Sequence, residues 1–140
     1  MNTAETLPID LFINRLTELS SGLYYLSESD YPLEPVKYSL TGTGGLSNPD
    51  IYDLAGKPSD SKIETVDLPY FFRNHTTDQA EADEDMKAMA QRFRELQTFL
   101  ENHLQDLKVY RIGQVEIEAL ILGKLNETQY AGLKTTVVET

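Results

Sequence analysis

The segment Met86-Lys-Ala-Met-Ala-Gln-Arg-Phe-Arg-Glu-Leu-Gln-Thr-Phe-Leu-Glu-Asn-His-Leu-Gln-Asp-Leu107 carries the strongest periodic signal in the chain. Its apolar residues recur at three- and four-residue steps, the spacing of one helix face; they are Met86, Met89, Phe93, Leu96, Leu100, Leu104 and Leu107. Asp83 can cap the start of this helix, and Glu84 and Asp85 complement its dipole. We therefore expect a long helix whose apolar stripe belongs to the core of the protein.

A shorter helix and several strands surround this segment. Pro8 suits a first helical turn, and Gly22 followed by Leu23 is typical of a helix end at which glycine adopts a positive φ. β-branched and alternating runs predict strands over residues 33–40, 62–68, 109–112, 115–122 and 133–139. Gly113, with a positive φ, is expected to turn a hairpin between two of them.

The remaining long segment, residues 41–61, is rich in glycine and proline and predicts a loop with a short element near residues 50–54. The resulting order of elements, α-β-β-α-β-β-β, favours an α+β fold with a largely antiparallel sheet and helices packed on it. At 140 residues the chain suits a single domain over residues 1–140.

Composition excludes several kinds of chemistry. The chain has no cysteine and two histidines, so it has neither a disulfide nor a Cys/His zinc site. For His75 and His103 we expect surface or capping roles, because no third polar group nearby in the sequence organises either as a general base. The sequence begins without a basic and apolar leader, and no run approaches about 18 apolar residues, so we expect a cytoplasmic protein without a membrane-spanning helix.

The net charge of −11 gives the chain an acidic surface. Acidity of this size keeps a protein soluble, and it also speeds association with a basic partner. Direct binding to nucleic acid is disfavoured, because contact with phosphates needs a patch of Lys and Arg and the sequence contains none.

Three patterns resemble catalytic motifs. Glu116 and Glu118 lie two apart in a predicted strand and could serve as a carboxylate pair for a hydrolase, although a solvated side of the sheet is the simpler interpretation. The run Gly42-Thr-Gly-Gly45 lacks the following helix that a phosphate loop needs. The spacing Ser59-Asp-Ser-Lys62 matches a nucleophile and its base by chance. We therefore expect a binding protein and not an enzyme.

The last residues, Lys134-Thr-Thr-Val-Val-Glu-Thr140, form a β-branched run without a polar tail. An ordered strand here would fix the α-carboxylate and hydroxyl of Thr140 beside the carboxylate of Glu139. These are hard oxygen donors of the kind that Mg²⁺ and Ca²⁺ accept. We expect this tip to reach into another molecule.

Acidic residues gather in further places along the sequence. Five acids and no base occupy the eight positions from residue 78 to residue 85: Asp78, Glu81, Asp83, Glu84 and Asp85. They form either a solvated helix start or one part of an anionic recognition face, to which Glu28, Asp30 and the terminal carboxylate of Thr140 would contribute other acidic tips. Glu139, beside Thr140, is expected to contact the partner as well.

Several short segments, taken together and in order, resemble those of a known family. They are Ser21-Gly-Leu23, Leu26-Ser-Glu-Ser-Asp-Tyr-Pro32, Val66-Asp-Leu68, Phe71-Phe72, Thr76-Thr77, Val109-Tyr-Arg-Ile-Gly-Gln-Val-Glu-Ile-Glu118, Ala131-Gly132 and Val137-Val-Glu-Thr140. Over most of its length from about residue 10, the chain resembles the nuclease A inhibitor family. The resemblance implies an αβα sandwich related to pathogenesis-related-protein folds.

The resemblance also implies a function. Members of this family are tight inhibitors of sugar-non-specific endonucleases, which cut DNA and RNA with a divalent cation in a basic groove. The chain would fill that active site, mimic phosphate, and ligate the catalytic Mg²⁺ through the C-terminus at Thr140, with no cofactor of its own. Glu28 would engage the active-site region, and Asp78, Gln79 and Glu81 would add contacts.

The chain departs from the family pattern at one contact position. Where the family can place an aromatic residue beside the acidic run, this sequence has Glu81. The alternative function is therefore an acidic interaction domain of the same fold that binds another basic partner, such as a toxin or a nucleic-acid-binding protein.

Overall fold

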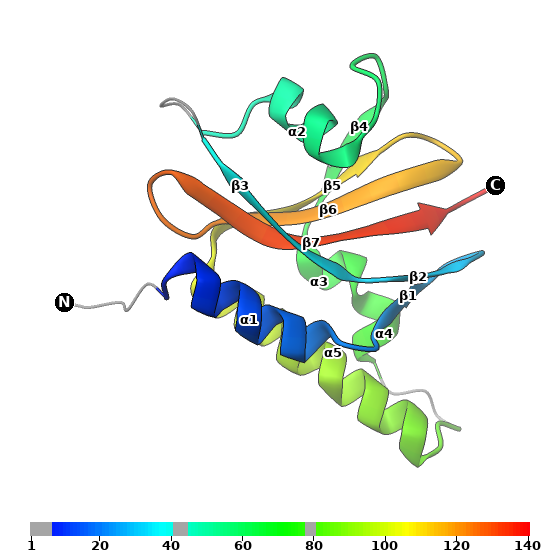
Figure 1. Cartoon of the computed structure of the whole chain (residues 1–140). Coiled ribbons are helices and arrows are strands. Elements are labelled where there is room, and N and C mark those ends of the chain that lie inside the picture. The colour runs from blue at the N-terminus through cyan, green and yellow to red at the C-terminus, as the bar shows by residue number, and fades with distance from the viewer. Residues whose placement is uncertain (1–6, 41–44, 78–80) are drawn as a thin grey trace.

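The computed structural model describes residues 7–40, 45–77 and 81–140. Their centre is a five-stranded antiparallel sheet with the strand order β3-β7-β6-β5-β4 (Figure 1). Its strands are β3 (Glu34–Ser39), β4 (Ile63–Val66), β5 (Gln105–Ile112), β6 (Glu116–Lys124) and β7 (Gln129–Val138). The α+β class and the antiparallel sheet that the sequence predicts are thereby confirmed.

Helices cover both faces of this sheet. Two long helices, α1 (Ile9–Ser20) and α5 (Glu84–His103), lie on one face, and α2 (Asn48–Ala55) lies on the other (Figure 1). Strand β6 explains why both faces need a cover, because its buried side chains alternate between two cores. Ile117, Ala119 and Ile121 belong to the larger core, which also contains apolar residues of α1 and α5, whereas Leu120 and Leu122 join Ile51 and Ala55 of α2 in the smaller one.

The long helix is shorter than its apolar stripe predicts. It ends at His103, Leu104 follows as its buried cap, and Leu107 already belongs to β5. Its burial is also uneven. Phe93, Leu96 and Leu100 are at most 2% exposed, but Met86 and Met89 are 50% and 42% exposed. The first turns of α5 extend beyond the sheet (Figure 1), so the expectation that the whole stripe is core was wrong at its N-terminal end. At the other end Leu104 and Leu107 do pack in the larger core, although Leu107 does so from a strand.

The positive φ predicted for two glycines is confirmed. Gly22 has a φ of 77°, the amide of Leu23 donates to the carbonyl oxygen of Ser20, and Leu23 is fully buried, as the predicted helix end requires. Gly113 has a φ of 116° in the turn between β5 and β6.

Two segments differ from the predicted ones. Residues 24–32 form a hairpin of two short strands, β1 (Tyr24–Leu26) and β2 (Asp30–Pro32), which pair with each other outside the main sheet. The strand predicted to reach Leu68 ends at Val66, because Asp67 caps a helix there by accepting a hydrogen bond from the amide of Tyr70. This helix is α3 (Leu68–Phe71), and α4 (Arg73–Thr76) follows it.

The short element expected near residues 50–54 is the helix α2, which a capping box between Ser47 and Asp50 begins. Among the described residues, no helix combines the length and the apolar character needed to cross a membrane.

The uneven burial of α5 gives a stability prediction. Leu96→Ala should lower the free energy of unfolding by about 2–5 kcal/mol, because it opens a cavity in the larger core. Met89→Ala, on the same helix but half-exposed, should cost less than about 1 kcal/mol. Denaturant unfolding of the two variants measures both values, and equal losses would contradict the division of the helix into a core part and a projecting part.

Candidate functional site

The tip of the β1–β2 hairpin lies beside the end of β7, at the right-hand end of the sheet in Figure 1. Backbone contacts join the two segments. The amide of Glu28 donates to the carbonyl oxygen of Val138 over 3.3 Å, and the amide of Val138 donates to the Ser27 hydroxyl oxygen over 3.1 Å. Residues more than 100 positions apart in the sequence therefore meet at one end of the sheet.

The Glu28 carboxylate holds Thr140 at two points. Its Oε2 accepts a hydrogen bond from the Thr140 amide, and its Oε1 accepts one from the Thr140 hydroxyl, each over 2.6 Å. The bonds from the hydroxyl and then from the amide lower the pKa of Glu28, because they stabilise its charged form. Both residues are exposed, so the clamp lies on the surface.

Glu139 is held from the opposite direction. Its carboxylate forms an ion pair with Arg111, with 2.6 Å between Oε2 and a terminal guanidinium nitrogen, and its amide donates to the carbonyl oxygen of Val115. The same guanidinium pairs with Glu64 on the neighbouring strand β4 over 2.5 Å. The Arg111 side chain is only 17% exposed, and its two ion pairs link the end of β7 to β5 and β4.

An aromatic cluster fixes the hairpin itself. The ring of Tyr25 stacks between Phe71 and His75, with centroid distances of 4.3 and 4.4 Å. The Tyr25 hydroxyl donates to the carbonyl oxygen of Phe71 over 3.0 Å. The His75 ring also packs on Phe93 of α5, with centroids 4.8 Å apart. The hairpin is therefore attached to α3, α4 and α5 and not only to β7.

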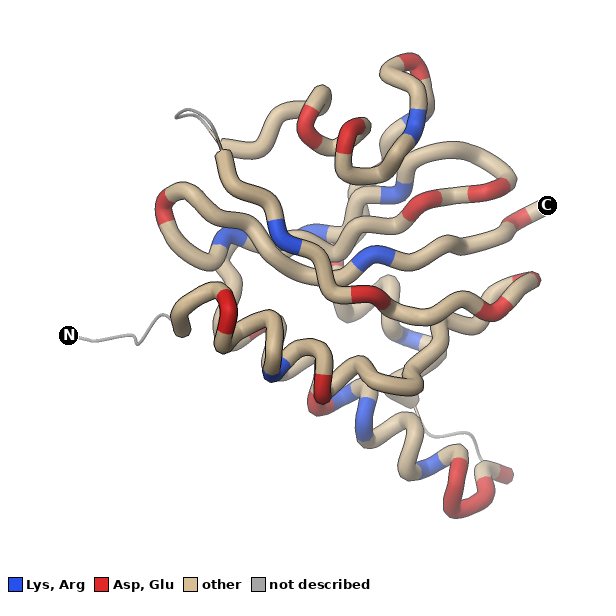
Figure 2. Tube along the Cα trace, viewed as in Figure 1, with Lys and Arg blue, Asp and Glu red and all other residues tan. Residues whose placement is uncertain are grey.

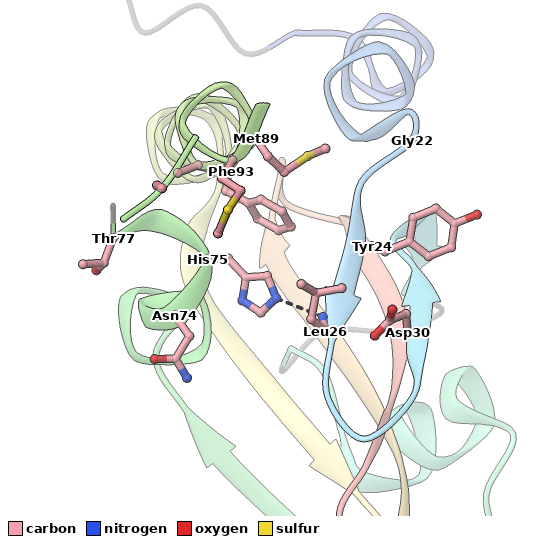
Figure 3. Close-up of a pocket in the computed structure, with 12 residues that line it drawn as sticks. Gly22, Tyr24, Leu26, Asp30, Asn74, His75, Thr77, Met89 and Phe93 are labelled. Atoms are coloured by element: carbon pink, nitrogen blue, oxygen red, sulfur yellow. Dashed lines mark hydrogen bonds between the residues drawn. The ribbon is translucent and has the colours of Figure 1, made fainter. Parts of the chain in front are cut away.

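His75 contributes a hydrogen bond as well as a ring. Its Nε2 accepts from the amide of Leu26 over 2.9 Å (Figure 3), so the proton of the neutral ring is assigned to Nδ1. This Nδ1 is buried and has no hydrogen-bond partner among the described residues. Burial lowers the pKa of His75. The surface or capping role that we expect for His75 from the sequence was wrong, because the ring is an internal support of the hairpin.

The predicted site residues come together only in part. Glu28, Asp30, Glu139 and Thr140 meet at this end of the molecule, and all four are exposed. Glu81 is also exposed and lies just before α5. Asp78 and Gln79 lie outside the described residues.

Sequence reasoning missed the residues that position the site. Ser27, Tyr25, His75 and Arg111 hold the two tips in place through the contacts described above. One signal was available, because the segments that carry the family resemblance include Ser27 and Arg111. Their partners lie far away in the sequence, however, and spacing cannot reveal them.

Glu116 and Glu118 do not form an open catalytic pair. The carboxylate of Glu118 accepts a hydrogen bond from the Thr136 hydroxyl over 2.6 Å and lies 4.0 Å from the Lys134 ammonium. The Glu118 side chain is 14% exposed, so the expected solvated side of the sheet is wrong for this residue and holds for the exposed Glu116. Glu118 therefore links β6 to β7.

Within the described parts of the chain, no group of three or more His, Cys, Asp or Glu residues could hold a metal ion. A family model described as nuclease A inhibitor-like protein matches residues 10–140. The chain has no match among curated proteins.

The buried ring of His75 gives a pH prediction. The pKa of His75 in the folded chain lies below its ordinary value of 6.5. The unfolded chain therefore takes up this proton first as the pH falls, and protonation of Nε2 also removes the acceptor for Leu26. The contribution of neutral His75 is present above pH 6.5, so the free energy of unfolding should fall between about pH 7 and about pH 5.

His75→Gln is the matched variant, because glutamine can accept from the Leu26 amide but does not titrate. Denaturant unfolding at both pH values should show a smaller loss for this variant than for the parent chain. His103 is present in both proteins, so its contribution cancels from the comparison. Equal losses would contradict the assigned role of His75.

Proposed function

This chain belongs to the nuclease A inhibitor-like family, and we propose that it inhibits a metal-dependent endonuclease that cuts DNA and RNA without sequence preference. The inhibitor fills the active site of the enzyme with the tip of the β1–β2 hairpin and the end of β7. Thr140 supplies an oxygen ligand to the divalent cation of the nuclease, Mg²⁺. The chain catalyses no reaction and needs no cofactor of its own.

The clamp between Glu28 and Thr140 carries this proposal. A ligand residue at the end of a strand is usually mobile, and ordering it on binding costs entropy. Here two hydrogen bonds of 2.6 Å fix the amide and the hydroxyl of Thr140. Thr140 is thereby prepared for binding before the partner arrives.

The exposed groups match what a nuclease active site is built to bind. Such a site receives phosphate oxygens with a metal ion and with Arg or Lys side chains. Threonine and carboxylate oxygens are hard donors suited to Mg²⁺. Each oxygen of an ionised carboxylate has two lone pairs, so Glu28 can accept from a basic group of the nuclease while it still holds Thr140. The inhibitor offers no phosphodiester bond, so it is bound and not cut.

Charge supports the same partner. Acidic residues lie at the hairpin, at the end of β7 and at the start of α5 (Figure 2), and the net charge is −11. In the proposed complex this acidic end faces the basic groove of the nuclease. Attraction between opposite charges raises association rates, up to about 10⁸–10⁹ M⁻¹s⁻¹ at low salt. In the proposed complex Asp30, Glu139, Glu81, Asp78 and Gln79 make further contacts with the nuclease.

Removing the charge of Glu28 tests the clamp. Glu28→Gln keeps the size of the side chain but presents an amide group that cannot accept both bonds from Thr140. We expect the dissociation constant for a metal-dependent non-specific endonuclease to rise about 30-fold or more. The free energy of unfolding should stay close to that of the parent, because Glu28 is exposed.

Glu127→Gln is the matched control. It removes the same charge in the turn between β6 and β7, where the Glu127 side chain is 96% exposed, at the other end of the sheet from the hairpin (Figure 1). This variant should bind nearly as tightly as the parent at fixed salt. If both substitutions raise the dissociation constant equally, Glu28 contributes to binding only through the net charge of the protein.

Lengthening the chain tests the role of Thr140. A Gly-Ser-Gly tail added after Thr140 should abolish inhibition, because it fills the space that the cation and its ligands need. The same tail placed before Met1 should leave inhibition unchanged. If the chain with the tail after Thr140 inhibits as well as the parent, Thr140 is not a ligand of the metal ion.

A panel of nucleases and other basic proteins separates this function from the alternative. Binding to a non-specific endonuclease that EDTA weakens supports the proposal. Binding to a different basic protein, equally tight with and without EDTA, identifies the chain as an acidic interaction domain instead.

A further inference from the structure

An open groove separates the β1–β2 hairpin from the start of α5 (Figure 3). Its volume is about 520 Å³. Leu26 stands on the hairpin side and Met89 on the helix side, with Phe93 and His75 between them. Met86, which also belongs to α5, lines the groove too, and we call this set of five residues the apolar groove.

The apolar groove concentrates the exposed apolar side chains of the protein. Tyr24 lies at its edge. Tyr24, Leu26, Met86 and Met89 are between 42% and 59% exposed, and they are four of the eight large apolar residues exposed in the described part of the chain. Scattered exposed apolar residues are ordinary, but a group of them around one hollow indicates a binding surface. Methionine side chains adapt their shape to the group they meet.

The hairpin side and the base of the groove are held in place by internal contacts. The Leu26 amide is tied to His75, and the His75 ring packs on Phe93, which is 2% exposed. Helix α5 projects beyond the sheet and so carries Met86 and Met89 to this place without burying them. A preformed hollow binds a side chain at lower cost than one that must first be ordered.

The apolar groove adjoins the proposed nuclease-facing surface on two sides. Leu26 lies two residues before Glu28, and Asp30 lines the rim on the hairpin side. On the helix side the lining residue Ala82 directly follows Glu81. A partner that meets Glu28 and Glu81 together therefore spans the groove.

We propose that the apolar groove receives an apolar side chain of the nuclease, next to a Lys or Arg that meets Asp30 or Glu81; this inference rests on the proposed function. Charge draws the two proteins together, whereas a buried apolar anchor lengthens the lifetime of the complex. In this proposal the nuclease supplies the apolar side chain and the inhibitor supplies the groove. An aromatic residue at position 81, which the family can have and this chain lacks, would be an anchor supplied by the inhibitor. The acidic rim and the net charge of −11 disfavour a second copy of this chain as the occupant.

The double variant Met86→Gln, Met89→Gln tests the proposal. Glutamine preserves side-chain length and helix propensity but removes the apolar character of one wall. Against the nuclease that the parent inhibits, the dissociation constant should rise about tenfold or more, chiefly through faster dissociation. The control Leu11→Gln makes the same kind of change at a residue of α1 that is 56% exposed and lies outside the groove, and it should not alter binding.

The outcomes separate this inference from the function on which it rests. Unchanged binding by the double variant, together with weakened binding by Glu28→Gln, overturns the groove proposal and keeps the inhibitor function. Failure of the parent chain to bind any nuclease overturns both.

Photo-methionine at positions 86 and 89 identifies the occupant directly. A cross-link to an apolar residue of the nuclease beside a Lys or Arg supports the proposal. Cross-links only between copies of this chain, with dimers in sedimentation, overturn it.

Discussion

The carboxylate of Glu28 joins the β1–β2 hairpin to the last residue of the chain, next to the contacts of Ser27 and Glu28 with Val138. Its two oxygens accept from the amide and the hydroxyl of Thr140, each over 2.6 Å. A hairpin of two three-residue strands is marginally stable by itself. The last residue of a chain is usually poorly ordered unless other contacts hold it. The contact between them therefore helps to hold both segments in place. A rigid acidic end follows from this mutual support, and the proposed inhibition needs such an end.

The clamp works because two further supports hold its halves. Arg111 fixes Glu139 against the sheet, and the rings of Tyr25 and His75 fix the hairpin to the helices. Two of the acids that the sequence offers to a partner, Glu28 and Glu139, thus also have partners inside the molecule. Both roles are compatible, because an ionised carboxylate has more lone pairs than these contacts use.

The same end of the molecule combines two kinds of recognition. In the proposed complex its acids serve the rate and orientation of encounter with a basic groove, and the apolar groove serves the lifetime of the complex. Helix α5 connects them, because its first turns leave the sheet and present Met86 and Met89 beside the acidic rim. The helical pattern assigns these two residues to the core. Their exposure is explained if they contact the nuclease, as proposed.

The sequence by itself determined the α+β class, the helix ends and turns marked by Gly22 and Gly113, and the resemblance that led to the family. These features depend on local periodicity, on glycine conformation or on short ordered motifs, all of which are written in neighbouring residues. Only the tertiary structure decided that α5 stops at His103, that residues 24–32 form a hairpin, and that His75 and Arg111 support the site. Each of these depends on contacts between residues far apart in the chain, such as Leu26 with His75 or Glu28 with Thr140, and spacing along the sequence cannot specify which distant groups meet.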